Sequence, residues 1–314
     1  MTTVTSSRPF QQVDVFTGTP GFGNPLAIVL DAEGLADEAM QRFARWTNLS
    51  ETTFVLPPTD PAADYRVRIF TPGGELSFAG HPTLGTCHAW LRAGGQPRRK
   101  GRVVQQCAVG LVDIRAGERL AFAAPPVRRS APSPMLLAKV AAALGLKAPQ
   151  ILAAQMLDNG PVWLGLLLAD DEAVLSLRPD HRALRELGQK IGVAGLPASQ
   201  ASPFLIGRSS REARAFGGRQ DEGDVAVAER EDAVDLEVRA FAAPIGVDED
   251  PVTGSLNASL AQWLIAEGHL GERYVAGQGQ CLGRDGRVFI ERDAEGQVWV
   301  GGDVAPCIEG RVAL

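Results

Sequence analysis

Two hexapeptides of this 314-residue chain lie 169 positions apart (250 minus 81): His81-Pro82-Thr83-Leu84-Gly85-Thr86 and Asp250-Pro251-Val252-Thr253-Gly254-Ser255. A proline, a glycine and a hydroxyl residue match between them. Related strand-like segments, 67–72 and 238–244, precede them, and apolar helical segments, 83–93 and 256–266, follow. A repeat over this length predicts two similar lobes of about 150 residues each, and not a solenoid.

Each hexapeptide is expected to lie at the start of a helix, where free N–H groups and the helix dipole attract anions. If the lobes face each other, both helix starts converge on one cleft, which would suit a small carboxylate. Gly85 and Gly254 would let the backbone approach a ligand closely. Thr86 and Ser255 would add hydroxyl donors.

Three candidate site residues, two in the hexapeptides and one outside them, can each be interpreted as structural or as functional. Asp250 followed by Pro251 is a good helix cap with proline at the first helical position, which needs no function. His81 is a poor cap, so it is either an ordinary structural histidine or a catalytic or binding one. Glu51 separates a predicted helix, 36–47, from a predicted strand, 52–56, and is either solvated or a buried acid/base.

Composition excludes several classes of function. Hydrophobic residues make up 45% and charged residues 22% of the chain, as in ordinary globular proteins. The formal charge of -6 argues against a nucleic-acid partner. The longest apolar run, 162–169, is far shorter than the roughly 20 residues that span a bilayer. No apolar signal core occurs in 1–9, so we expect a cytoplasmic protein without membrane contact.

No cofactor or metal is expected. The chain has no glycine-rich phosphate loop and no zinc-like spacing of cysteine and histidine. The cysteines are expected to be small buried residues, neither paired nor catalytic: Cys87, Cys107, Cys281 and Cys307. His88 is expected to be a satisfied core histidine.

Further elements follow from periodicity and composition. Helices are predicted at 135–144 and 184–191, a buried strand at 162–169, a strand-like piece at 281–283 and a linker at 125–134. The charged stretch 217–232 is interpreted as a solvated loop, with a lid as the alternative.

Three strings together resemble the PhzF-like phenazine-biosynthesis isomerase family: Ser50-Glu51-Thr52-Thr53-Phe54-Val55, Phe78-Ala79-Gly80-His81-Pro82-Thr83-Leu84-Gly85-Thr86 and Asp248-Glu249-Asp250-Pro251-Val252-Thr253-Gly254-Ser255. The opening Val13-Asp14-Val15-Phe16 and Gly23-Asn24-Pro25 fit as well. The resemblance covers almost the whole chain.

The resemblance implies a diaminopimelate epimerase-like α+β fold. It has two pseudo-symmetric lobes, each a curled, mostly antiparallel sheet around a central helix. The N-terminal lobe would comprise 1–125 plus about 305–314, because the last strand crosses back, and the C-terminal lobe 126–304. The active site would lie in the cleft between them, and a homodimer is implied.

The resemblance also implies roles for individual residues. Glu51 inherits the general acid/base role. His81, Asp250 and Ser255 inherit substrate contact and proton-transfer support, and weaker positioning roles fall to Ser50, Gly80 and Gly254. The two cysteine bases of related epimerases are missing from the helix starts, which argues against two-thiol epimerisation.

The leading hypothesis is a cofactor-independent isomerase that moves a proton on a small carboxylic acid, cyclic or not. One alternative is a lyase or epimerase acting on an amino acid derivative with the same base. The other is a protein that binds a small carboxylate without turnover.

Overall fold

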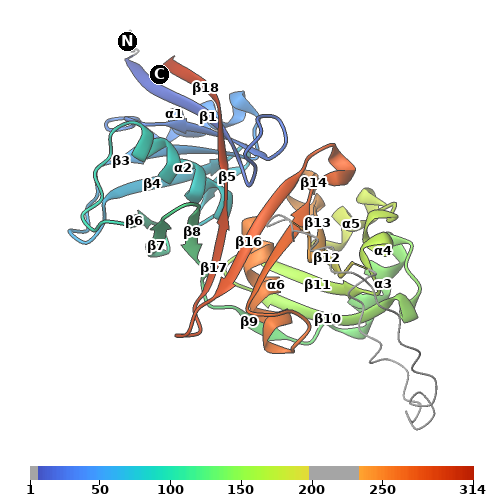
Figure 1. Ribbon diagram of the computed structural model, residues 1–314. Helices are drawn as coiled ribbons and strands as arrows, with labels where there is room; N and C mark the ends of the chain where they lie inside the picture. Colours follow the sequence, from blue (N-terminus) through green and yellow to red (C-terminus); the bar gives the residue numbers. More distant parts are fainter. Residues whose placement is uncertain (1–5, 198–232) are drawn as a thin grey trace.

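The computed structural model describes residues 6–197 and 233–314 and contains two lobes (Figure 1). The strands of the first lobe are β1 (Ser7–Val15), β2 (Asn24–Val29), β3 (Glu51–Leu56), β4 (Tyr65–Thr71), β5 (Gly74–Leu76), β6 (Arg102–Cys107), β7 (Gly110–Ala116) and β8 (Leu120–Ala123). Those of the second lobe are β10 (Ile151–Asp158), β11 (Val162–Leu168), β12 (Lys190–Gly195), β13 (Leu236–Ala242), β14 (Val247–Asp250), β15 (Arg273–Gln278), β16 (Gly286–Arg292) and β17 (Val298–Gly302).

Few helices accompany these strands. They are α1 (Asp37–Thr47), α2 (Gly80–Arg92), α3 (Pro134–Leu144), α4 (Asp171–Leu175), α5 (His181–Leu187) and α6 (Gly254–Ala266), with short 3₁₀ helices at Ala148–Gln150, Ala243–Ile245 and Gln280–Leu282. The predicted α+β class is confirmed. None of the helices in the described ranges is long and apolar enough to cross a membrane.

The strand pairings of the first lobe recur in the second. An antiparallel pair, β1–β2, continues through parallel β3 to antiparallel β4, which also pairs with β5 and, in parallel, with β6. The same pattern runs from β10 and β11 through β12 and β13 to β14 and β15. In both lobes the helix that follows, α2 or α6, precedes an antiparallel meander. The predicted two-fold repeat is therefore present in the topology.

The alignment expected within the repeat is wrong by a few residues. Leu26 faces Glu51 across β2–β3, and Trp163 faces Lys190 across β11–β12, so Glu51 and Lys190 are equivalent. The central helices begin at Gly80 and Gly254, an offset of 174 (254 minus 80) in place of 169.

Asp250 is not a helix cap, which explains the wrong offset. It is the last residue of β14, opposite Ala240 of β13, and Thr253 is the residue that precedes α6. The Gln278 side chain donates to the Asp250 carbonyl at 3.0 Å, which holds this residue in the strand. Asp-Pro therefore ends a strand here, although the same dipeptide is common at helix starts.

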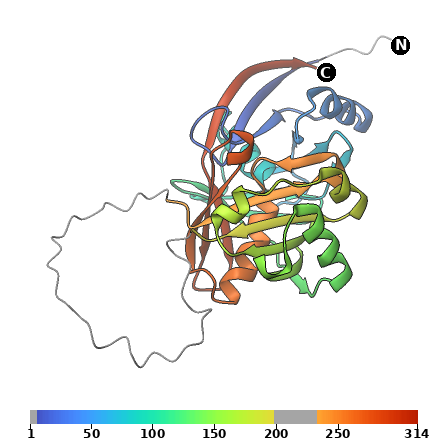
Figure 2. The same cartoon turned by 90° about the vertical axis from the view of Figure 1, so that its right-hand side faces the viewer.

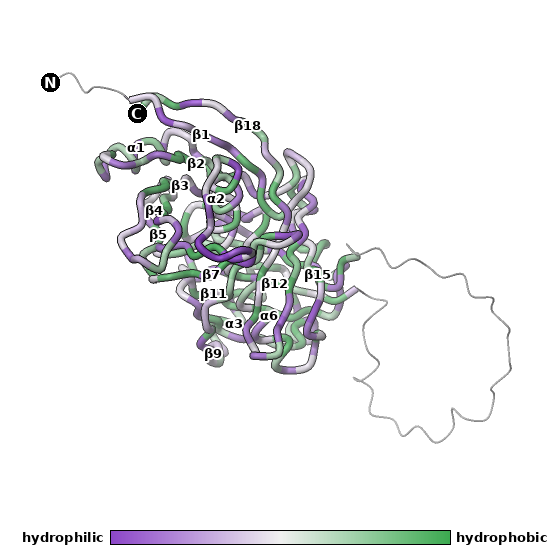
Figure 3. Tube along the Cα trace, turned by 60° about the vertical axis from the view of Figure 1, so that its left-hand side comes forward, coloured by the Kyte–Doolittle hydropathy of each residue, from purple (hydrophilic) through white to green (hydrophobic). Residues whose placement is uncertain are grey.

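One strand crosses back between the lobes, and another forms inside the predicted linker. β18 (Val304–Ala313) returns to pair with β1, and β9 (Arg128–Ser130), inside the predicted linker, pairs with β10 (Figures 1 and 2). β8 and β17 also pair across the lobes. Hydrophobic and hydrophilic residues follow one another along β18 (Figure 3). We keep the lobe limits, 1–125 with about 305–314 and 126–304, as a proposal that these pairings support.

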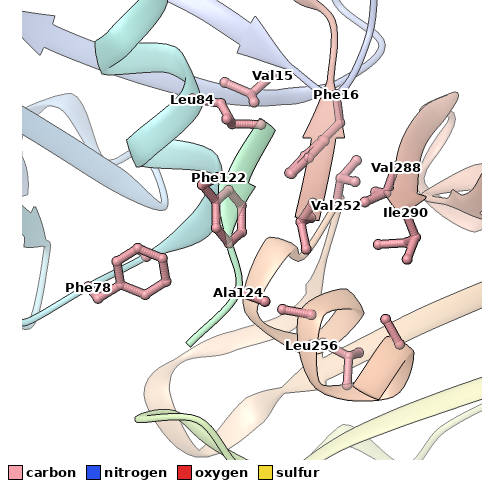
Figure 4. Close-up of a cluster of buried hydrophobic side chains, with 14 of the residues drawn as sticks. Val15, Phe16, Phe78, Leu84, Phe122, Ala124, Val252, Leu256, Val288 and Ile290 are labelled. Carbon is pink, nitrogen blue, oxygen red and sulfur yellow. The ribbon is translucent and has the colours of Figure 1, made fainter. Parts of the chain in front are cut away.

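The two central helices form the core that positions the site. Leu84 of α2 and Leu256 of α6 are completely buried, and Phe122 and Val252 lie between the helix starts (Figure 4). Most residues of α2 and nearly all of α6 are buried, as expected of a helix enclosed by a sheet.

Several local predictions need correction. The predicted helix 184–191 is wrong at its end: Gly188 closes α5 with a φ of 69°, and Lys190 begins β12. Residues 281–283 fall mostly in a 3₁₀ helix, not a strand. All four cysteines are free, as predicted, but Cys281 and Cys307 are exposed, so the expectation that all are buried is wrong.

His88 is only partly buried, and its Nε2 has no hydrogen-bond partner in the described chain, so it is not a satisfied core histidine. The stretch 217–232 lies outside the described residues.

Candidate active site

The starts of the two central helices touch each other. A Cβ atom added to Gly80 would lie 2.9 Å from the Gly254 Cα, and one added to Gly254 would lie 3.0 Å from the Gly80 Cα. Only glycine allows backbones to approach this closely. Neither preceding residue, Ala79 or Thr253, caps its helix with a side chain. The positive ends of both helix dipoles therefore meet at one place.

Glu51 and His81 lie side by side at this junction. Their nearest atoms, Oε2 and Nε2, are 3.2 Å apart, and the two side chains are 15% and 5% exposed. Neither atom makes a well-aligned hydrogen bond within the described chain. Buried polar atoms normally make hydrogen bonds, so two that face each other without one indicate a place for a ligand.

Burial changes the proton affinities of both groups. It raises the pKa of Glu51 to about 8, and the neighbouring Asp250 carboxylate adds to this effect while Lys190 opposes it. Burial also lowers the pKa of His81 to about 3. At neutral pH the histidine is therefore neutral, and Glu51 can both hold and release a proton.

Asp250 joins this group from the second lobe. Its carboxylate accepts hydrogen bonds from the Asn24 amide at 2.9 Å and from the Thr253 hydroxyl at 2.7 Å. Burial raises the pKa of Asp250 to about 6, although these two bonds work against that rise. Asn24 belongs to β2 of the first lobe, so its bond to Asp250 ties the lobes together at the site.

Lys190 was not identified from the sequence, although its charge acts on both carboxyl groups. Glu51 and Asp250 oppose the lowering of its pKa by burial. Its Nζ lies 4.9 Å from the centre of the Trp163 ring, and the Trp163 indole donates to the Ser255 hydroxyl at 3.3 Å. Lys190 lies within the predicted helix, 184–191, whereas in the structure it begins β12. Only the strand register, which makes it the counterpart of Glu51, reveals its position.

Of the remaining predicted residues, Ser50 and Ser255 lie near the site, whereas Gly85 and Thr86 face the sheet. Ser50 precedes Glu51 directly, and Ser255 lies in the first turn of α6 with its carbonyl bound by Asn159. Gly85 instead faces the side chains of Leu26, Val15 and Val13 in the sheet. The buried Thr86 hydroxyl donates to that of Thr53 at 2.9 Å. The placement of Gly85 and Thr86 gives no support to the substrate contacts predicted for them.

Three hollows on the described surface do not coincide with this site. A hollow of about 500 Å³ is lined by Arg115, Arg119, Phe289 and Trp299, among others, and contains none of the predicted site residues. Its arginines are engaged by acidic or aromatic neighbours. In the ranges that the structure describes, no three His, Cys, Asp or Glu side chains are grouped as metal ligands would be.

The chain matches the model of the family described as phenazine biosynthesis-like protein over residues 13–217 and 220–310. It is 33% identical to a trans-2,3-dihydro-3-hydroxyanthranilate isomerase of Pseudomonas aeruginosa, covering 96% of this chain and 98% of that one. It is 32% identical to antisense-enhancing sequence 1 of Schizosaccharomyces pombe, covering 98% and 99%.

The fold agrees with these matches. The structure of a phenazine biosynthesis protein of the PhzF family from Bacillus anthracis superposes with a TM-score of 0.75 at 24% identity, covering 98% of this chain and 100% of that chain. The predicted resemblance, fold and isomerase class are confirmed. The chain belongs to the phenazine biosynthesis-like, or PhzF, family.

Proposed function

We propose that this protein is an isomerase that moves a proton between two carbons of a small carboxylic acid, with Glu51 as the general acid/base. The observation that carries the proposal is the buried Glu51 carboxyl, whose Oε2 makes no hydrogen bond and lies 3.2 Å from Nε2 of neutral His81, where the two helix starts meet. The name of the Pseudomonas aeruginosa relative makes trans-2,3-dihydro-3-hydroxyanthranilate the first substrate to test.

The proton transfer needs only groups of this chain. The Glu51 carboxylate takes a proton from a carbon activated by a neighbouring double bond, whose electrons shift along the substrate. The Glu51 carboxyl then returns the proton to a different carbon on the same face, so no atom is gained or lost. A pKa of about 8 suits both halves of this cycle near neutral pH.

The other predicted residues support this step. The free N–H groups of the first turns of α2 and α6 stabilise negative charge that develops on the substrate. His81, neutral at working pH, contacts the reacting region beside Glu51. Asp250 accepts a hydrogen bond from a polar substituent or holds the charge that raises the Glu51 pKa. Ser50, Gly80, Gly254 and Ser255 shape the site around them.

We also propose that the protein works without a bound cofactor, that it is a homodimer, as the resemblance implies, and that it is cytoplasmic. Size-exclusion chromatography with light scattering tests the homodimer. Fractionation of cells that express the natural gene tests the location.

The activity should depend on pH in a direction that the pKa of Glu51 fixes. The base must be ionised, so kcat/KM should rise about tenfold per pH unit from pH 6, around which Asp250 ionises, to pH 8, and level off above pH 8. His81 should add no transition between pH 5 and 9, because its pKa is about 3. Initial rates measured from pH 5 to 9 check this. A flat profile through pH 8 would assign the base to another group.

Asp250→Asn should move that transition toward lower pH. Removing the negative charge that raises the Glu51 pKa makes the Glu51 carboxyl easier to ionise. The variant should therefore lose activity at its plateau, because contacts to Asn24 and Thr253 change, while its pH profile shifts to the acid side. Asp248→Asn, an exposed acid two residues earlier, is the matched control and should leave the profile in place. A shift toward higher pH in Asp250→Asn would contradict the assignment.

A further inference from the structure

Lys190 has an unusual environment for a lysine. Its side chain is half-buried, and burial lowers its pKa. Within the described chain its ammonium makes no hydrogen bond and no ion pair, and it lies 4.9 Å from the centre of the Trp163 ring. Removing an ammonium from water without a partner is unfavourable, and buried charges are normally paired, so an unpaired ammonium here indicates a place for an anion.

The duplicated topology places this lysine opposite the proposed base. Lys190 is the first residue of β12, as Glu51 is the first residue of β3, and each faces an apolar residue of the neighbouring parallel strand. His81 accompanies Glu51 at the start of α2. Ser255, at the same position in the first turn of α6, is bound by the Trp163 ring over which Lys190 lies. The junction of the helices therefore has an acid on one side and an ammonium on the other.

Neither carboxyl group of the site neutralises the lysine. The Lys190 ammonium acts on Glu51 and Asp250 through space, yet it is too far from both for an ion pair. Both oxygens of Asp250 already accept hydrogen bonds, from Asn24 and Thr253. Glu51 holds a proton over most of the neutral range. The positive charge remains available to a bound molecule.

We propose that Lys190 binds the carboxylate of the substrate whose proton Glu51 moves. The inference rests on the proposed function, and it adds a cationic contact to the helix N-termini. It also narrows the substrate class, because the carboxylate must lie toward the second lobe while the reacting carbons lie toward Glu51. A carboxylate attached to a ring or short chain that also carries the reacting carbons meets this requirement.

Equilibrium binding of two matched ligands tests the proposal without turnover. Anthranilate and anthranilamide have the same ring and amino group, and only the first carries a carboxylate. Calorimetry at pH 7 should show that the parent protein prefers anthranilate and that Lys190→Met lowers this preference about tenfold or more, the usual effect of losing a charged hydrogen bond. Lys190→Arg should keep most of the preference, since it keeps the charge.

Two controls separate this role from a structural one. Lys139→Met, on the exposed face of α3, should bind both ligands as the parent does. Lys190→Met should unfold at the same or a higher denaturant concentration than the parent, because it removes an unpaired, half-buried charge. Equal weakening of both ligands would show that Lys190 acts only on the carboxyl groups or on packing, which overturns the proposal. So would an undiminished preference in Lys190→Met, or a parent protein without any preference.

Failure here is distinguishable from failure of the proposed function. Glu51→Gln keeps the lysine, so it should bind anthranilate in preference to anthranilamide as the parent does. If that preference persists but Glu51 proves not to be the base, only the catalytic assignment fails. If Glu51 is the base but Lys190→Met keeps the preference, only the carboxylate assignment fails.

Discussion

Glu51→Gln should lose turnover by about 10²-fold or more while it still folds and binds a carboxylate ligand. Glutamine has nearly the same shape and reach as glutamate, but its amide cannot shuttle a proton. The carboxyl is almost buried, has no hydrogen-bond partner at Oε2, and lies 3.2 Å from the His81 ring. The substitution therefore removes the chemistry of the group and leaves its volume in place.

Solvent deuterium incorporation is the most direct measurement of this loss. While Glu51 holds the proton, part of it exchanges with solvent before it is returned to the substrate. Product formed in D₂O should therefore carry deuterium from the parent protein and hardly any from Glu51→Gln. Glu75→Gln, an acid on β5 paired with Arg68 at the surface, is the control and should exchange at the parental rate. If Glu51→Gln exchanges as fast as the parent, the base is His81 or Asp250.

Stability gives an independent check that Glu51→Gln is folded. The pKa of Glu51 is about 8 in the folded protein and near 4.5 when exposed, so the folded state holds a proton that the unfolded state releases between these values. The contribution of Glu51 to the free energy of unfolding is therefore present below pH 4.5 and falls as pH rises to 8. Glutamine removes this dependence. Above pH 8 the variant should be at least as stable as the parent.

Much of the site could be predicted because its residues lie in short, contiguous strings. Glu51, His81 and Asp250 are separated by up to 199 positions (250 minus 51), yet the structure brings them to one junction. The repeated hexapeptides indicated two helix starts and a cleft between lobes. The predicted offset of the repeat is wrong. Proline, glycine and hydroxyl residues match at an offset of 169 residues, whereas the starts of the central helices are 174 residues apart. The local sequence pattern does not show how many residues one copy of the repeat has gained between its strand and its helix.

Lys190 could not be predicted for a different reason. Its local sequence, Leu187-Gly188-Gln189-Lys190-Ile191, continues the apolar spacing of a helix. Gly188 in the left-handed region ends that helix, and the chain turns directly into β12. The position of Lys190 beside the site follows only from the parallel register of β11 and β12, which pairs it with Trp163. Such long-range register is set by packing of both lobes and not by the neighbours of one residue.

Gly254→Ala should lower the free energy of unfolding by about 1–3 kcal/mol and reduce turnover more than tenfold. Its new methyl group would lie 3.0 Å from the Gly80 Cα and 3.3 Å from the His81 nitrogen. These are backbone atoms at the start of α2, so they cannot rotate away as a side chain could. The helices must separate, and the separation moves His81 and Ser255 relative to Glu51.

Gly80→Ala should lower stability and turnover in the same way, because its methyl group would lie 2.9 Å from both the Gly254 Cα and the Phe122 ring. Gly74→Ala is the matched control, since a methyl group there meets nothing within 4 Å. Denaturant unfolding and initial rates of the three variants and the double variant Gly80→Ala/Gly254→Ala check the prediction. Both methyl groups would enter the same contact, so the cost of the double variant should depart from the sum of the single costs. Strict additivity, or single variants that match Gly74→Ala in stability and rate, would mean that the helix starts do not meet in solution as they do here.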